Sequence, residues 1–517
     1  MGAHMNRFLV FVLLMTTTAL GSQISTSPAP SDQSTPVTFN KDVLPILQNN
    51  CQTCHRPGEV APMSFLTFES TRPWAKAIKA AVLSKKMPPW LADSHYGGFR
   101  NAPELTATDI KTLAAWADTG AAEGNPADKP EPIQFFDGWR IQPDVIVSMP
   151  TPHSIGAKGA GEIKEFFVDN PFKEDTWVTS IEIRPGDPSV VHHVIVQVQE
   201  QPSAKGFAWG ALNCAPALDT LVPLLRRTPT VGRDTRGGGG GGYGSKSDER
   251  VTEASFTTMD AVYAPGSPPL DFRYHNSAKL IRGGKPIRIE VHYTPNGKAT
   301  TDQTRIGFTL AQGPTQRRFV MMAPTSLVDK DKPIPAGAQN FETMGELTFK
   351  QNAELVWFMP HMHLRGKDMT FRLVYPNGLS DTVLSAKFSF QWQLGYEVEE
   401  PIKIPKGTKM IVTAHYDNSA NNRLNPTPDK EVRWGELTSD EMMLPWFGVV
   451  VNQDADPAMI ASYVPGGAKD SEPNAPAFRL PTPTFFPSVP NVPNLPKVPN
   501  GSKPGVIPSL IKLDKIK

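Results

Sequence analysis

Several of the eleven histidines in this chain stand in patterns that metal sites use. His361 and His363 follow an apolar run that begins at Leu355. Side chains two residues apart on a strand project from the same face, so both imidazoles can grip one ion. Imidazole suits copper, zinc, iron or nickel. The segment therefore predicts a transition-metal site on a strand.

A second pattern is Cys51, Cys54 and His55, which read Cys-x-x-Cys-His. In this motif the two thiols form thioethers to a porphyrin, and the histidine becomes the proximal iron ligand. A zinc site would need another cysteine pair, and the chain has only three cysteines. A thioredoxin-type redox pair would need a preceding strand, which the sequence does not predict. The motif therefore predicts covalently attached haem c.

Three more histidines interrupt apolar runs. His192 and His193 lie inside the Val/Ile-rich stretch 190–196, and His292 alternates with Ile and Val in 285–294. Buried imidazoles need partners, and a metal is one kind of partner. Adjacent strand residues point opposite ways, so joint ligation by the pair needs a twist, a bulge or a strand end. The alternative is a core histidine next to a surface one.

The elements that must position these residues change character along the chain. Residues 39–124 show helical periodicity, with helices expected over 74–86 and from Thr106 to Gly120. After the joint 125–132, the 52 Pro and 40 Gly with β-branched runs between them favour short strands. Strands are expected over 177–183, 190–196, 285–294, 319–322, 353–358, 369–375, 388–394 and 410–416.

Length and composition limit the number of domains, the partners and the location of the protein. A chain of 517 residues predicts two to four domains, and a net charge of +1 suggests no nucleic-acid or acidic-membrane partner. Residues 1–21 read as a secretory signal with a tag remnant at 1–4, so we expect an exported protein, periplasmic or secreted, without a membrane span. Low-complexity segments are expected as a linker (22–38), a mobile Gly-rich insert with the unpaired Cys214 (near 204–257) and a Pro-rich tail (456–517).

Residues 39–124 resemble a small class I cytochrome c. In that family a methionine on a loop after the middle of the domain supplies the sixth iron ligand, and Met87 matches this position. Met63 and His95 are the competing distal ligands. A Met–His iron has a raised potential and no free site, which suits electron transfer. The resemblance implies a small all-α domain at this end of the chain.

Over roughly 168–451 the order of motifs resembles the type II copper monooxygenases. These are the peptidylglycine α-hydroxylating and dopamine β-monooxygenases and their bacterial relatives. The resemblance implies two copper ions and two all-β, jelly-roll-like sandwich domains, 133–312 and 313–455. The implied ligands of the electron-transfer copper are His192, His193 and His292. The implied ligands of the oxygen-binding copper are His361, His363 and Met442, the last from Asp440-Glu441-Met442.

Some residues depart from the family pattern. The animal enzymes carry several disulfides, and here only Cys214 is left to take part in one. The peptide-processing members have an arginine two residues before His-x-His, and this chain has Met359, so a glycine-extended peptide is not the expected substrate. Met443 is an alternative to Met442. His415 has no ligand role in the animal enzymes and is interpreted as a structural residue or a support for a ligand.

The resemblance predicts a haem–copper monooxygenase that uses O₂ to hydroxylate a C–H bond of a small organic substrate. Electrons would come from the fused cytochrome c, or from ascorbate or a redox protein. The alternative is a non-enzymatic copper- and haem-binding electron carrier that uses the same ligands. A zinc hydrolase is disfavoured because no Glu or Asp base stands beside His361-Met362-His363.

Overall fold

The computed structural model describes residues 36–463 except 104, 136–137, 160, 199–255, 314, 325–326, 329–330 and 436. These residues fall within one compact unit, Met1–Lys469. The expected signal peptide, most of the linker, nearly all of the Gly-rich insert with Cys214, and the tail beyond 463 lie outside the described residues.

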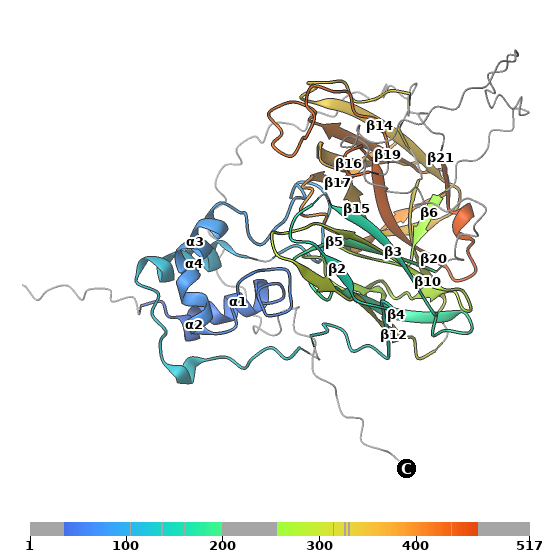
Figure 1. Ribbon diagram of the computed structural model, residues 1–517. Helices are drawn as coiled ribbons and strands as arrows, with labels where there is room; N and C mark the ends of the chain where they lie inside the picture. Colours follow the sequence, from blue (N-terminus) through green and yellow to red (C-terminus); the bar gives the residue numbers. More distant parts are fainter. Residues whose placement is uncertain are drawn as a thin grey trace, which may run out of the picture. The chain divides into compact units, whose positions relative to one another are not determined.

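The described chain is mostly β, as the sequence predicted. The first β unit pairs a five-stranded sheet with a four-stranded one (Figure 1). The five-stranded sheet contains β1 (Val145–Ser148), β12 (Arg305–Leu310), β4 (Thr176–Arg184), β8 (Leu270–Asp271) and β9 (Lys279–Ile281). The four-stranded sheet contains β3 (Glu162–Val168), β10 (Ile287–Tyr293), β5 (Val191–Val198) and β7 (Ala261–Tyr263). A small ribbon joins β2 (His153–Ile155) to β11 (Thr300–Asp302).

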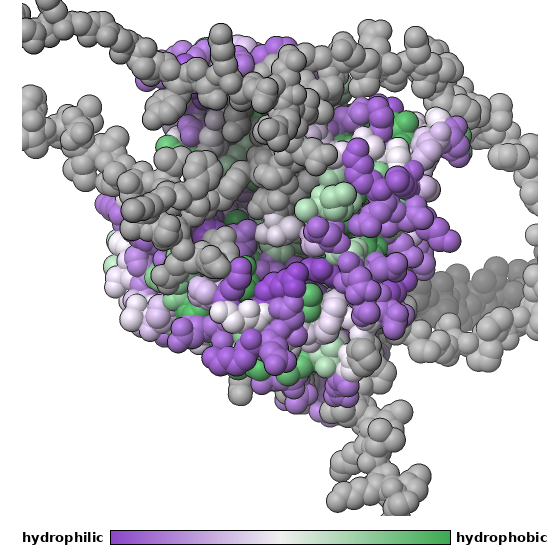
Figure 2. Space-filling view, turned by 90° about the vertical axis from the view of Figure 1, so that its right-hand side faces the viewer, coloured by the Kyte–Doolittle hydropathy of each residue, from purple (hydrophilic) through white to green (hydrophobic). Residues whose placement is uncertain are grey.

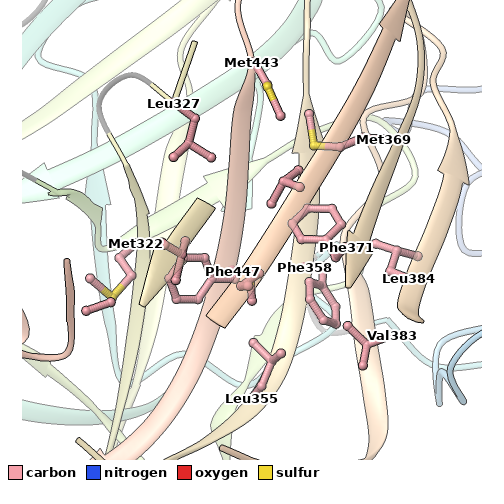
Figure 3. Close-up of a cluster of buried hydrophobic side chains, with 14 of the residues drawn as sticks. Met322, Leu327, Leu355, Phe358, Met369, Phe371, Val383, Leu384, Met443 and Phe447 are labelled. Carbon is pink, nitrogen blue, oxygen red and sulfur yellow. The ribbon is translucent and has the colours of Figure 1, made fainter. Parts of the chain in front are cut away.

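The second β unit consists of two five-stranded sheets. One contains β18 (Tyr396–Ile404), β15 (Ala353–His361), β20 (Leu444–Asn452), β13 (Arg317–Pro324) and β6 (Phe256–Met259). The other contains β17 (Ser380–Lys387), β16 (Gly366–Val374), β19 (Lys409–Tyr416), β14 (Phe341–Phe349) and β21 (Ala461–Tyr463). The apolar core between them is shown in Figure 3, where Phe358 of β15 lies beside Phe371 of β16.

The β18-β15-β20-β13-β6 sheet is buried on both faces. On β15, Leu355 and Phe358 belong to the core of the second unit, whereas Val356 and Met359 pack into an apolar cluster shared with the first unit. Strands buried on both faces read as near-continuous apolar runs, which explains the unbroken stretch before His361. The same sheet therefore joins the two β units through apolar packing.

Short helices form the N-terminal part of the described chain. They are η1 (Phe39–Val43), α1 (Leu44–Asn50), α2 (Phe68–Thr71), η2 (Arg72–Trp74), α3 (Ala75–Leu83) and α4 (Ala107–Asp118), followed by η3 (Pro126–Asp128). Thr106 and Asp109 form a reciprocal capping box that starts α4. Leu113 and Trp116 of α4 pack with Phe39 in a separate apolar core.

One segment of the helical part reaches the second β unit. Ala92 bridges to Ala386 of β17, and Phe99 bridges to Val398 of β18. The ring of Trp90 packs edge-on against Tyr396, with centroids 5.0 Å apart. We call residues 90–101 the strap, because they lie along two strand ends of the second unit.

Three expectations differ from the observed elements. Residues 388–394, expected as a strand, form the connection between β17 and β18. Phe390 stacks on His192, whereas Trp392 and Leu394 pack with the core of the second unit. β6 begins inside the expected insert and pairs with β13 of the second unit. β21, preceded by η5 (Pro457–Met459), lies in residues assigned to the tail, and it forms because the edge of β14 accepts it.

The face seen in Figure 2 carries mainly hydrophilic residues among those described, with hydrophobic residues in small groups. None of the helices in the described stretches is long and apolar enough to cross a membrane.

Candidate metal centres

The first histidine set, His192, His193 and His292, is assembled by an irregularity in one ladder. In the pairing of β5 with β10, His292 lies opposite His193, and the next residue, Tyr293, lies opposite Val191. His192 is therefore the extra residue of a β-bulge. The bulge turns two adjacent imidazoles the same way, and the Nδ1 atoms of His192 and His193 are 2.9 Å apart.

The Nε2 atoms of His192 and His292 are bound to the protein. His192 Nε2 lies 2.5 Å from the carbonyl oxygen of Phe390, and the two rings stack with centroids 4.2 Å apart. His292 Nε2 lies 2.7 Å from Glu290 Oε1, and Glu290 also pairs with Arg288. A ring nitrogen held in this way fixes the tautomer and leaves the other nitrogen for a metal. For His192 and His292 that nitrogen is Nδ1.

The second histidine set has the opposite arrangement. His361 ends β15 and His363 follows in the turn, with ring centroids 5.4 Å apart, while Met362 points into the core of the second unit. His361 Nδ1 lies 2.6 Å from Gln393 Oε1, and His363 Nδ1 lies 3.3 Å from the carbonyl oxygen of Asp440. The nitrogen left for a metal in this set is therefore Nε2.

The Asp-Glu-Met segment supports the second set from behind. The carboxylate of Glu441 is fully buried and accepts the backbone N–H groups of His363, at 3.0 Å, and Arg365, at 2.6 Å. Burial raises the pKa of Glu441 to about 7. Met442 packs on the side of the shared apolar cluster, whereas Met443 is buried in the core of the second unit, as Figure 3 shows. Of the two methionines, Met442 is thus the one outside that core.

Arg365 anchors the same turn and was not singled out from the sequence. Its side chain is fully buried. The guanidinium donates to acceptors on Asn418, Asn425, Thr427 and the carbonyl of Ser439. A buried guanidinium with these four acceptors holds the loop that precedes Asp440 in place.

The two histidine sets lie in contact with each other. The rings of His193 and His361 are edge-on, with centroids 5.7 Å apart, and those of His193 and His292 are 3.7 Å apart. Burial lowers the pKa of His192 and of His361 to about 4 and holds those of His193 and His363 well below their ordinary range. All four imidazoles are therefore neutral near pH 7, the protonation state that metal ligands need.

The donor types suit copper, although the rings of His193 and His292, with centroids 3.7 Å apart, lie closer than two ligands around one ion. In the part of the chain that the structure describes, no group of three His, Cys, Asp or Glu side chains is placed so that it could hold an ion without rearrangement. However, His193 Nε2 is buried without a hydrogen-bond partner. An orphaned polar atom of this kind indicates a missing partner. Neutral imidazoles and thioethers are ligands that copper accepts.

The Cys-x-x-Cys-His motif follows α1 in a tight turn. The amides of Cys54 and His55 both donate to the carbonyl of Cys51. Burial raises the pKa of the Cys51 thiol to about 12 and also raises that of Cys54. Redox-active cysteine pairs have lowered thiol pKa values, so this pair lacks that property. His55 stacks on Phe65, and its Nδ1 is buried without a hydrogen-bond partner.

The three candidate distal ligands lie in different surroundings. Met63 packs against the apolar core of the helices. Met87 is half-buried and stands between α3 and the strap. His95 lies within the strap with an 82 % exposed side chain and contacts Asp93 at 2.6 Å. Its exposure and its partner make His95 the weakest of the three candidates.

The turn after His55 contacts the first β unit through charged groups. Glu59 binds Arg56 at 2.6 Å and Arg184 of β4 at 2.8 Å. Arg56 also donates to the carbonyl of Gly138, at 3.0 Å. The neighbouring Glu182 accepts the backbone N–H of Arg140, at 2.7 Å. The Cys-x-x-Cys-His turn is thus held against the unit that carries the first histidine set.

His415 lies outside the two histidine sets. Its Nδ1 is 2.6 Å from Asp368 and its Nε2 is 3.1 Å from Glu342, each on a neighbouring strand. Two carboxylates therefore occupy both ring nitrogens, which supports the structural interpretation. The supporting residues Glu290, Phe390 and Gln393 were missed by sequence reasoning. Of these, Glu290 stands two residues before His292 on the same strand face, and this spacing is the one signal that was available.

Comparisons with known proteins add little. No family model and no curated protein matches this chain. A solved structure of the infectious bursal disease virus Gt strain is similar over 62 % of this chain and 78 % of that chain, with 9 % identity and a TM-score of 0.12. Similarity at this level indicates neither a shared fold nor a shared function.

Proposed function

We propose that this protein is an exported haem–copper monooxygenase that hydroxylates a C–H bond of a small organic substrate with O₂. The observation that carries the proposal is that His192 and His292 of the first set leave Nδ1 for a ligand, whereas both histidines of the second set leave Nε2. Two different ligand geometries suit two ions with different tasks. Copper would supply electron storage at the first set and O₂ activation at the second.

Each candidate ligand has a defined task in this proposal. His192, His193 and His292 would hold the electron-transfer ion with three imidazoles. His361, His363 and Met442 would hold the other ion, since a soft thioether favours the reduced state of copper. Glu441 and Arg365 keep the His-x-His turn in place through buried hydrogen bonds, and burial keeps the imidazoles neutral.

The helical part would supply the electrons. Cys51 and Cys54 would attach haem c, with His55 as proximal ligand and Met87 as the first candidate for the distal one. Glu59, in the turn after His55, is bound to Arg184 of the first β unit. The strap, which belongs to the same helical part, lies on the second β unit. A donor fixed to both units has no need to diffuse to them. Ascorbate or a redox protein would reload it.

Metal content and oxygen isotopes test the proposal. The full chain, loaded with Cu(II), should contain two copper ions and one haem, with two distinguishable EPR signals. With ascorbate and a panel of small organic substrates, ¹⁸O₂ should give a product that carries one ¹⁸O atom. Oxygen uptake that stops once the stored electrons are used, with no labelled product from any substrate, would favour the electron-carrier alternative.

A further inference from the structure

The connection between β17 and β18, residues 388–395, touches both histidine sets. It belongs to the second β unit, yet the carbonyl of Phe390 accepts from His192 of the first unit. Three residues later, Gln393 accepts from His361 of the second. We call this segment the bridging loop. It is one of the stretches that sequence reasoning assigned to a strand.

The side chain of Gln393 has a defined orientation. It is 2 % exposed, its Oε1 lies 2.6 Å from His361 Nδ1, and its Nε2 donates to the carbonyl of Phe390 at 3.5 Å. If the amide were reversed, its N–H group would face His361 Nδ1, the ring nitrogen that donates to the loop. Its oxygen would then face the carbonyl oxygen of Phe390. The network therefore fixes which end of the amide faces His361.

We propose that Gln393 is a positioning residue that links the two metal centres through one hydrogen-bond chain. The chain runs from His361 Nδ1–H to Gln393 Oε1, then from Gln393 Nε2–H to the carbonyl of Phe390, which also accepts from His192 Nε2–H. Gln393 thus keeps Nε2 of His361 unprotonated and steadies the acceptor that keeps Nδ1 of His192 unprotonated, the atom that lies 2.9 Å from His193 Nδ1. The inference rests on the proposed function only in taking the bound ions to be copper.

The loop is held from outside by the helical part. Asn101 of the strap donates to the carbonyl of Gly395 at 2.8 Å, and Trp90 packs on Tyr396, the first residue after the loop. Trp392 lies against the core of the second unit. At the other end of the loop the amide of Phe388 donates to the carbonyl of Lys367, at 2.7 Å. With both ends held, a change at position 393 acts on the histidines rather than on the course of the loop.

The first test needs no copper. In the copper-free full chain with ¹⁵N-labelled histidine rings, NMR should show His361 protonated at Nδ1 and His192 protonated at Nε2. Gln393→Leu should shift the His361 proton towards Nε2, whereas Gln393→Glu keeps an acceptor and should retain it. Gln391→Leu is the matched control, since Gln391 lies in the same loop with an exposed side chain. An unchanged His361 tautomer in Gln393→Leu overturns the proposal.

The second test uses Cu(II) binding to the same four proteins. Residues that support a metal-bound histidine change metal affinity by about 10- to 100-fold when replaced. Gln393→Leu should weaken the second site by this factor and the first site by about fivefold, which is one ordinary hydrogen bond. Weakening confined to the second site would overturn the link between the centres. If the tautomers and affinities behave as stated but no ¹⁸O-labelled product forms, the bridge stands and the monooxygenase function fails.

Discussion

At the residue scale, two adjacent methionines offer a matched pair. Met442 lies beside the shared apolar cluster and Met443 is buried in the core of the second unit. Met443→Ala should lower the free energy of unfolding by about 2–5 kcal/mol, because it leaves a cavity, and should keep copper. Met442→Ala should destabilise less and reduce product formation by about 100-fold or more. Copper titration, denaturant unfolding and product assays check both variants.

The opposite results would contradict the assignment of Met442 as the ligand. Loss of activity in Met443→Ala, with Met442→Ala active, would move the thioether ligand by one residue. Loss of both metal ions in either variant would mean a single shared site rather than two.

Two methionine variants test which residue is the distal haem ligand. Met87→Ala should open the iron and lower the reduction potential, because a thioether stabilises Fe(II). Met63→Ala is the control, and it should mainly loosen the helical core against which Met63 packs. Optical spectra and redox titration of both variants decide the assignment. An unchanged potential in Met87→Ala, with a lowered one in Met63→Ala, would reverse the two roles.

At the element scale, the strap can be tested without reference to any metal. Two backbone hydrogen bonds join the strap to β17. The amide of Asp93 donates to the carbonyl of Ser385, and the amide of Lys387 in β17 donates to the carbonyl of Leu91. Trp90→Ala removes the packing on Tyr396, so these two amides should exchange with solvent about tenfold faster for each 1.4 kcal/mol lost. Trp74→Ala, outside the strap, should leave them unchanged. Equal protection in the parent and Trp90→Ala would mean that the strap is held by its backbone bridges alone.

The same scale shows what the sequence could and could not predict. Periodicity predicted strands near β4, β5, β10, β15 and β19, since each alternates or runs apolar over its length. The pattern also indicated that joint ligation by His192 and His193 needs a twist, a bulge or a strand end, and the structure has a bulge there. The bridging loop did not. Its aromatic residues resemble strand residues, and only the tertiary contacts of Phe390 and Gln393 show why they are there.

Hydrogen-bonded pairs far apart in the sequence could not be predicted for a related reason. Glu441 stands 78 positions from His363, whose amide it accepts. Nothing in the local pattern of either segment indicates the other. The strap was missed likewise, because residues 90–101 have the composition of an ordinary loop and acquire their strand-like bridges only from β17 and β18.

At the scale of the whole molecule, Glu397 lies where the strap and both β units meet. It pairs with Arg100, whose guanidinium covers the ring of Tyr274. Burial, opposed by Arg100, raises the pKa of Glu397 to about 7. The folded state thus prefers the protonated form, so its stabilising contribution is full below about pH 4.5 and is lost as the pH rises through about 7.

Glu397→Gln cannot ionise and should therefore gain on the parent as the pH rises. The difference in unfolding free energy should move in favour of the variant by up to about 3 kcal/mol between pH 4.5 and 7.5, at about 1.4 kcal/mol for each unit of pKa. Denaturant unfolding at several pH values measures it. The variant also loses a pairing with Arg100, so its absolute stability is not the test. A difference that stays constant with pH would contradict the raised pKa.

The arrangement of the helical part against both β units bears on how electrons would reach the copper sites. Two one-electron ions need two electrons per turnover, and a free donor must find them each time. A tethered donor has an effective concentration of about the millimolar range, provided the joint can span the distance. Here the joint is short, and the contacts of Glu59 with Arg184 and of the strap with β17 and β18 restrict it further.

We therefore expect the reduced haem, in the presence of copper, O₂ and substrate, to be reoxidised at a rate independent of protein concentration. The same haem should remain reduced much longer when His192 and His193 are both replaced by Ala, because the first ion is then absent. Stopped-flow spectra of the haem at several protein concentrations measure both rates, and His415→Ala is a control histidine outside the two sets. If reoxidation is equally fast without His192 and His193, electrons do not pass through the first histidine set. A rate that rises in proportion to protein concentration would mean that the haem of one molecule serves another, despite the contacts that hold it in place.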